Sequence, residues 1–187
     1  MARTLIPLAQ GCEELEAVTL IDLLRRAGIE VVTAGLEAGP VNASRGVRLL
    51  PDTTLDAVME ESFDMIVLPG GLPGADHLNA DQRIHDLLRR MDAAGGYCAA
   101  ICAAPKVLAS AGLLDGRQAT SYPGVLDAMD LPKVEIGLKP VIRDGRVITS
   151  RGPGTAMDFA LELIEVLVGK QKRDQVEAGL AREKGVA

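Results

Sequence analysis

The sequence predicts an α/β fold in which a mostly parallel sheet is covered by helices on both faces. Short strand-like stretches alternate with helical stretches along the chain, and the central strand candidates are apolar along their full length. Alternation favours parallel strands joined through helices, and a continuously apolar strand is typical of one buried on both faces. The 187 residues contain no linker, low-complexity tract or internal repeat, so we expect a single domain, residues 1–187.

The spacing of apolar residues, and the glycine and proline residues that end elements, predict the strands and helices in the first half of the chain. Strands are predicted at residues 4–9, 29–34, 47–50 and 64–68, and helices at residues 13–27 and 81–94, with a brief helix capped by Thr53 or Thr54. Gly28 ends the first helix, as glycine commonly does just past a helix C-terminus. The last of these strands ends at Pro69-Gly70-Gly71.

The second half continues the alternation and ends in a strong helix. We expect strands at residues 97–101, 118–121, 141–142 and 146–149, and helices at residues 104–111 and 154–168. The pair Asp144-Gly145 indicates a hairpin between two of these strands. In such folds ligands bind beyond the carboxyl ends of the strands, which selects the turns at residues 10–13, 69–71 and 102–104.

Composition excludes several classes of function. The net charge of -6 disfavours a nucleic-acid partner, and the two Tyr, two Phe and absent Trp leave little for base stacking. The basic run at residues 170–173 is expected to solvate a helix face. The sequence has no stretch long enough for a membrane span and no signal-peptide core. With three irregularly spaced cysteines, we expect neither disulfides nor a metal site, and a reducing cytoplasm.

The three cysteines differ in their surroundings. Cys98 lies inside an apolar strand and is expected to be structural filler. Cys12 lies in the turn after the first strand, where an accessory and an incidental role stay equally open. Cys102 ends a buried strand and is followed by Ala103-Ala104-Pro105, which predicts a tight turn into a helix. The helix N-terminus would stabilise a thiolate, so we expect Cys102 to be reactive rather than simply buried.

A carboxylate interrupts the apolar face of the first helix. Glu16 falls on the same stripe as Leu20 and Leu23, at helical spacing. A glutamate that faces a core is costly unless it is hydrogen-bonded or protonated. The alternative is that Glu16 has no role in a site and simply lies in the first turn of the helix, where a negative charge is favourable. If the helix starts at the site, Glu16 reaches Cys102 and can exchange a proton with it.

Five motifs in order resemble the ThiJ/PfpI superfamily, in its DJ-one (Parkinson-associated deglycase-like) branch. They are residues 11–16 (GCEELE), 24–29 (LRRAGI), 67–71 (VLPGG), 99–105 (AAICAAP) and 149–155 (TSRGPGT). The resemblance covers the chain from the first strand to about residue 168. It implies a flavodoxin-like three-layer sandwich of the class I glutamine amidotransferase type, a homodimer and no cofactor.

The resemblance also assigns roles to residues. It implies that Cys102 is the reactive cysteine, that Glu16 is its partner, and that backbone N–H groups near Gly70, Gly71 and Ala103 form an oxyanion pocket. Arg45 and Ser150 are similar to residues that line or support this pocket. Tyr122 stands where close relatives have a histidine. The two histidines, His77 and His85, are expected to be ordinary surface residues, which disfavours Cys-His hydrolysis.

Two functions of different classes remain. The first is a glyoxalase or protein deglycase, in which Cys102 attacks a 2-oxoaldehyde such as methylglyoxal, or an early glycation adduct on a side chain, and Glu16 shuttles the proton. The second is a redox sensor or redox-regulated chaperone without metabolic turnover, in which Cys102 is oxidised to sulfinic acid.

Overall fold

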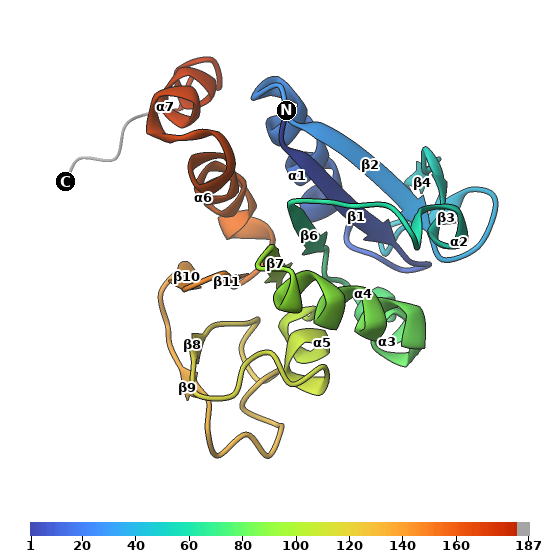
Figure 1. Cartoon of the computed structure of the whole chain (residues 1–187), viewed down its shortest axis with the longest axis vertical. Helices are drawn as coiled ribbons and strands as arrows, with labels where there is room; N and C mark the ends of the chain where they lie inside the picture. The colour runs from blue at the N-terminus through green and yellow to red at the C-terminus, as the bar shows by residue number, and fades with distance from the viewer. Residues whose placement is uncertain (183–187) are drawn as a thin grey trace.

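The computed structural model describes residues 1–182 and places a twisted seven-stranded sheet at the centre of the molecule (Figure 1). The order across the sheet is β10-β11-β7-β6-β1-β2-β5, and every neighbouring pair is parallel except the β10–β11 hairpin. The strands are β1 (Arg3–Leu8), β2 (Glu30–Gly35), β5 (Thr53–Thr54), β6 (Met65–Leu68), β7 (Tyr97–Ile101), β10 (Val141–Asp144) and β11 (Val147–Ser150).

Helices cover both faces of this sheet, which confirms the predicted flavodoxin-like three-layer sandwich (Figure 1). One face packs against α1 (Glu14–Arg26), α6 (Ala156–Val168) and α7 (Lys170–Ala178). The other packs against α2 (Leu55–Val58), α3 (Gly74–Ala80), α4 (Gln82–Ala93) and α5 (Pro105–Ser110).

Alternate strand residues feed two separate apolar cores. In β1, Leu5 belongs to the core under α2–α5, whereas Ile6 belongs to the core under α1 and α6. In β7, Ala100 and Ile101 divide in the same way. Side chains of successive strand residues point to opposite faces, so a strand covered on both sides must be apolar throughout. This explains the continuously apolar sequences of the central strands.

Four further strands lie outside the main sheet. An antiparallel hairpin joins β3 (Val41–Asn42) to β4 (Arg48–Leu49), and β8 (Gln118–Ala119) pairs in parallel with β9 (Glu135–Ile136). A short 3-10 turn, η1 (Pro153–Thr155), leads into α6. The sequence predicted neither β3 nor α3, because their residues lack a sustained apolar period.

The parallel strands bring three turns to one edge of the sheet. Residues 9–13 follow β1, residues 69–73 follow β6, and residues 102–104 follow β7. The backbone N–H of Glu13 donates to the carbonyl of Gly70, 2.9 Å away, so the first two turns are hydrogen-bonded to each other. None of the helices within residues 1–182 is long and apolar enough to cross a membrane.

Candidate active site

Cys102 occupies a left-handed backbone conformation directly after β7. Its φ is 63°, a region that side chains rarely adopt, and flanking bonds hold it there. Its N–H donates to the carbonyl of Ser150 at 3.0 Å, and its own carbonyl accepts from the N–H of Tyr122 at 2.8 Å. Such strain persists only when surrounding structure fixes it, and it is found preferentially at functional sites. The turn therefore holds the thiol at the carboxyl edge of the sheet.

Glu16 is fully buried and lies against this thiol. The side chain leaves the first turn of α1, where Glu13 caps the helix by accepting from the Glu16 N–H at 2.9 Å. One carboxyl oxygen of Glu16 accepts from the Gly70 N–H at 2.8 Å. The carboxyl lies against the Cys102 side chain at Gly70, and its other oxygen, Oε1, has no hydrogen-bond partner within residues 1–182. Glu16, the charged residue that interrupts the apolar stripe of α1, thus points into the site.

Burial dominates the electrostatics of the pair. It raises the pKa of Glu16 to about 7, against hydrogen bonds from Gly70 and Cys102 that lower it. Burial also raises the pKa of Cys102 to about 12, and the Glu16 charge raises it further, while the N–H groups of Gly71 and Ala103 lower it. Between these two values the pair retains a single proton, on the Cys102 thiol, and a thiolate requires its transfer to the Glu16 carboxylate.

The stabilisation of a Cys102 thiolate that was expected from the N-terminus of the following helix is therefore outweighed by burial. The helix that follows, α5, begins only at Pro105 and is six residues long, and burial outweighs any helix contribution to the thiol. The donors near sulfur are instead the backbone N–H groups of Gly71 and Ala103. A thiolate forms here when the proton moves from sulfur to Glu16, and the protonated carboxyl can then donate a hydrogen bond to sulfur.

Two glycines make room for this arrangement. A Cβ on Gly70 would lie 2.6 Å from the Cys102 Cβ and 2.8 Å from Glu16 Oε2. Gly71 has a φ of 88°, and a Cβ there would lie 2.4 Å from the Glu13 nitrogen. Because the Gly70 N–H is already bonded to Glu16, only Gly71 and Ala103 direct N–H groups at the sulfur. The predicted three-donor pocket is thus two donors at sulfur and one that orients the carboxyl.

Tyr122, Ser150 and Arg45 differ in how close they come to the thiol. A Cβ on Gly152 would contact the Tyr122 ring at 3.3 Å and the Cys102 sulfur at 4.0 Å, so the half-exposed ring and the sulfur face the same space beside Gly152. Ser150 is buried, donates from Oγ to the Pro140 carbonyl at 2.8 Å and supports Cys102 only through its backbone. The Arg45 side chain is exposed, and the described contacts of Arg45 are backbone ones.

Glu14 organises the loop that carries Arg45, a role that the sequence did not reveal. Its carboxylate accepts from the N–H groups of Arg45, at 2.9 Å, and Val47, at 3.4 Å, and from the Ser44 hydroxyl, at 3.1 Å. Burial opposes ionisation of Glu14, but these bonds and one from its own backbone hold its pKa below the usual value. Nothing in the helical pattern distinguishes Glu14 from an exposed first-turn glutamate. Its hydrogen-bond partners lie about 30 residues further along the chain, so only the folded structure reveals them.

The sequence profile of the DJ-1/PfpI family matches residues 2–166. The chain belongs to the DJ-1/PfpI family. It is 48% identical over 177 residues to protein dj-1beta of Drosophila melanogaster, covering 94% of this chain and 95% of that protein.

A further relative and two solved structures bear on function. The Caenorhabditis elegans glutathione-independent glyoxalase DJR-1.2 is 38% identical over 167 residues, 89% of each chain. Drosophila DJ-1beta superposes with a TM-score of 0.94 at 45% identity, covering 98% of this chain and 99% of that one. Oxidized Toxoplasma gondii DJ-1 gives 0.93 at 40% identity, covering 98% and 100%. The family thus includes glyoxalase-type enzymes.

The remaining cysteines and histidines lie away from the paired site or lack its surroundings. Cys98 is buried under α4, where its thiol contacts the Leu88 carbonyl at 3.7 Å, as expected for structural filler. Cys12 is also buried, and burial and neighbouring glutamates raise its pKa to about 12. His77 lies on α3 rather than in a loop, and His85, 8% exposed, is buried rather than at the surface. Within residues 1–182, no group of metal-ligating side chains is arranged to hold an ion.

Proposed function

We propose that this protein is a cofactor-free, cysteine-dependent glyoxalase that converts small 2-oxoaldehydes to 2-hydroxy acids. The observation that carries the proposal is the pairing of the Cys102 thiol with a buried Glu16, beside the N–H groups of Gly71 and Ala103. Conversion of a 2-oxoaldehyde into a 2-hydroxyacyl thioester requires a nucleophile, a group that carries a proton and donors for the oxyanion, and this site supplies all of them.

The first step forms a covalent adduct. In the tautomer with the proton on Glu16, the Cys102 sulfur attacks the aldehyde carbon of methylglyoxal and a C–S bond forms. The aldehyde oxygen takes the Glu16 proton, and the product is a hemithioacetal with Glu16 as carboxylate. The N–H groups of Gly71 and Ala103 stabilise the oxygen while its charge develops.

Isomerisation and hydrolysis complete the cycle. The Glu16 carboxylate removes the proton from the carbon bonded to sulfur, which gives an enediol, and returns a proton to the neighbouring carbon. This shift produces a 2-hydroxyacyl thioester without any external oxidant. Water then cleaves the C–S bond, releasing lactate and restoring the single proton of the pair. A carboxyl whose pKa is about 7 can both give and accept a proton near neutral pH.

An early glycation adduct offers the same chemistry to the enzyme. Such an adduct is a hemiaminal of a side-chain nitrogen and a 2-oxoaldehyde, so transfer of its carbonyl fragment to Cys102 leads to the same hemithioacetal. Cys102 is 9% exposed, so an adduct on a small amine fits this access better than a bulky one. Deglycase activity on small glycated amines is therefore a second expected activity of the site.

Lactate formation from methylglyoxal tests the proposal directly. We expect turnover in the purified protein without glutathione or added metal, and no turnover above background in Cys102→Ser. Cys98→Ser is the matched control, because this thiol lies under α4 and has no carboxyl partner. Lactate formation that survives in Cys102→Ser would contradict the proposal.

Oxidation of the same sulfur is a second candidate function, for which the donors around it provide support. A sulfinate at Cys102 would present two oxygens to the N–H groups of Gly71 and Ala103 and to a protonated Glu16. A redox sensor, or a redox-regulated chaperone, would use this stabilised state in place of turnover. Mild peroxide is then expected to add two oxygens to Cys102 and none to Cys98, as read by mass spectrometry. A reducing compartment such as the cytoplasm keeps the thiol available for either function.

We also propose that the protein forms a homodimer through the exposed side of α1. Leu15 and Val18 are 52% and 45% exposed on this helix, and the adjacent hairpin, tied to α1 by Glu14, adds Val47 at 48%. Contiguous exposed apolar residues are typical of interfaces. Val18→Glu is expected to give a monomer by analytical ultracentrifugation, whereas Met157→Glu, an equally exposed apolar position on α6, leaves a dimer. A dimeric Val18→Glu variant would contradict this interface.

A further inference from the structure

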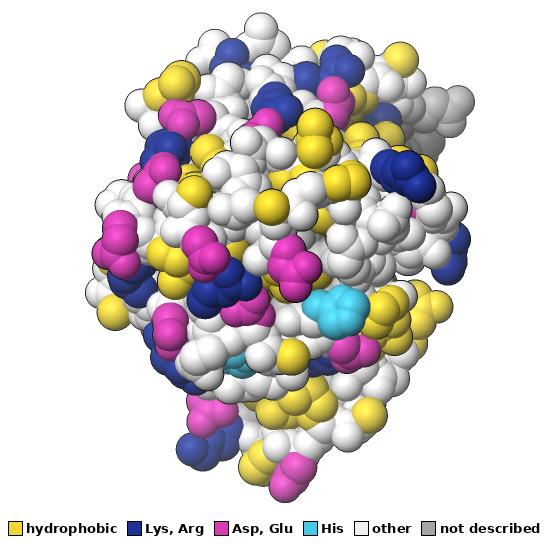
Figure 2. Space-filling view, turned by 90° about the vertical axis from the view of Figure 1, so that its right-hand side faces the viewer, with side chains coloured by type: hydrophobic (Ala, Val, Ile, Leu, Met, Phe, Trp, Pro, Cys, Tyr) yellow, Lys and Arg dark blue, Asp and Glu magenta, His cyan; other side chains and the backbone are white. Residues whose placement is uncertain are grey.

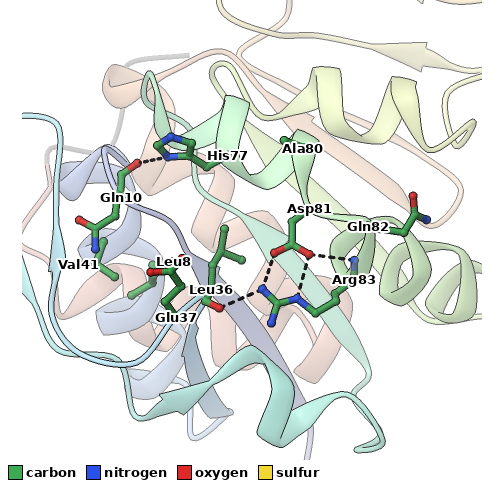
Figure 3. A pocket seen from close by; sticks show the side chains of 10 residues that line it. All are labelled: Leu8, Gln10, Leu36, Glu37, Val41, His77, Ala80, Asp81, Gln82 and Arg83. Carbon is green, nitrogen blue, oxygen red and sulfur yellow. Dashed lines mark hydrogen bonds and ion pairs between the residues drawn. The ribbon is translucent and has the colours of Figure 1, made fainter.

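A separate cavity of about 550 Å³ opens beside the first turn of the carboxyl edge. It lies between the ends of β1 and β2 on one side and the α3–α4 junction on the other (Figure 3). The volume is in the range of small-molecule sites. Its lining residues are Leu8, Gln10, Leu36, Glu37, Val41, His77, Ala80, Asp81, Gln82 and Arg83.

This cavity does not include the reactive cysteine or its partners. The turn at residues 11–13 separates them: the Gly74 N–H donates to the Gly11 carbonyl at 3.2 Å, and the Glu13 N–H donates to Gly70. These bonds close the backbone between α3 and the site of Cys102. The cavity is therefore a second concave site, and the mechanism proposed above does not use it.

The floor of the cavity is apolar. Leu8 and Val41 are 1% and 3% exposed and close the cavity from below, and the partly buried Leu36, beside Leu8, presents accessible apolar surface between the two polar ends (Figure 3). Ala80, the last residue of α3, adds a small apolar side chain at the rim. An aliphatic or aromatic body of a ligand can be buried on this surface, which favours binding through the removal of apolar area from water.

The arginine at the rim is not available to an anion. Arg83 donates from Nε and Nη2 to Asp81, from Nη1 to Asp56, and from Nη2 to the Leu36 carbonyl. These bonds occupy most of the donors of the guanidinium and fix it in place (Figure 3). Two carboxylates already surround one positive charge, so an anionic ligand would meet net negative charge here.

The remaining polar groups at the rim are the Gln10 and Gln82 amides, His77 and the Glu37 carboxylate, of which Glu37 alone is an acid. His77 Nδ1 lies 2.9 Å from the Gln10 carbonyl, which can only accept, so Nδ1 is the donor of this bond. Glu37 is exposed, and its carboxylate has no ion-pair partner within residues 1–182. Acidic and histidine side chains beside hydrophobic atoms are visible on this side of the molecule (Figure 2).

We infer that this cavity binds a small organic amine, with its ammonium group at Glu37 and its apolar body on the accessible surface of Leu36 and Ala80. The charge selects a cation over an anion, and the apolar floor selects an amine with a hydrocarbon chain or ring over a metal ion. Small amines that react with 2-oxoaldehydes belong to this ligand class, but the site binds the amine without Cys102.

Phenethylamine is a suitable probe, measured by titration calorimetry on the full chain. We expect saturable binding of one equivalent of phenethylamine. Phenethyl alcohol, which is neutral, should bind more weakly, and phenylacetate, which is an anion, should bind most weakly, although all three carry the same ring. Glu37→Gln should weaken phenethylamine about three- to fivefold, the effect of one exposed ion pair. Glu60→Gln, an exposed glutamate outside the cavity, should leave the affinity unchanged.

Two further variants separate this cavity from the reactive cysteine. Ala80→Phe places a ring at the rim without removing a buried group and should abolish binding, while circular dichroism checks that the variant is folded. Cys102→Ser should bind phenethylamine as the wild type does. Absence of saturable binding, phenylacetate binding as well as phenethylamine, an unchanged affinity in Glu37→Gln, or loss of binding in Cys102→Ser would each overturn the inference.

Discussion

Replacing Glu16 by glutamine should flatten the pH dependence of stability. Burial raises the pKa of Glu16 from an ordinary 4.5 to about 7. In the unfolded chain the carboxyl ionises near 4.5, so the folded state binds more protons between these two values and loses stability as the pH rises. The contribution is present in full below 4.5 and is lost above 7. The change in the free energy of unfolding is about 3 kcal/mol, since one pH unit corresponds to about 1.4 kcal/mol.

Urea denaturation followed by circular dichroism measures this change. We would determine the free energy of unfolding of the wild type and of Glu16→Gln from pH 4 to pH 8 at one protein concentration. Glutamine keeps an acceptor for the Gly70 N–H but does not ionise. The variant should gain about 3 kcal/mol relative to the wild type between pH 4 and pH 8. Glu60→Gln, at an exposed position, is the control. Parallel pH profiles for the wild type and Glu16→Gln would refute a buried carboxyl with a raised pKa.

Two other substitutions test how the site is held. Gly70→Ala should destabilise the fold by about 1–3 kcal/mol and suppress Cys102 alkylation, because a Cβ there lies 2.7 Å from the rigid Ile101 carbonyl. Gly154→Ala has no atom within 4 Å to meet and should leave stability and alkylation unchanged, whereas equal effects of both would contradict the steric explanation. Glu14→Ala leaves the Arg45 and Val47 N–H groups without their acceptor, so hydrogen exchange at residues 43–47 should accelerate by about tenfold or more; unchanged exchange would show that the carboxylate does not hold this loop.

The sequence predicts the fold well because its signals are local. Apolar runs that must be buried on both faces determine β6 and β7, and Gly28 and Pro69 end their elements where predicted. The strand at residues 118–121 shows the limit of this reasoning. Its β8 portion pairs with β9 in a separate small sheet, and pairing partners depend on tertiary contacts that a local pattern does not encode.

The site was only partly predictable for a related reason. Glu16 could be found because one charged residue in an apolar stripe conflicts with the local pattern, and such conflicts concentrate at functional sites. Glu14 could not, because a glutamate in a first helical turn is ordinary until Ser44 and Arg45 are seen against it. Burial and the nearby charge of Glu16 raise the pKa of Cys102, and the spacing of residues along the chain reveals neither of them.

Turnover and oxidation both start from the Cys102 sulfur, but they require Glu16 in different ways. Isomerisation of the hemithioacetal needs a group that gives up a proton and takes one back, which glutamine cannot do. Stabilising a sulfinate needs only a hydrogen-bond donor, which the amide of glutamine supplies. Glu16→Gln should therefore lower lactate formation about 100-fold or more, the usual contribution of a positioned acid–base group.

Peroxide treatment of the same variant completes the comparison. The Glu16 charge raises the pKa of Cys102, so its removal in Glu16→Gln makes the thiolate easier to form, and mass spectrometry should still show two added oxygens on Cys102. Cys102→Ser loses both lactate formation and oxidation. If lactate formation in Glu16→Gln stays within a few-fold of the wild type while sulfinate is lost, the carboxyl serves oxidation and not proton transfer. A loss of both would mean that Glu16 is needed to form the thiolate itself. The two measurements together therefore separate proton transfer by Glu16 from hydrogen bonding by Glu16.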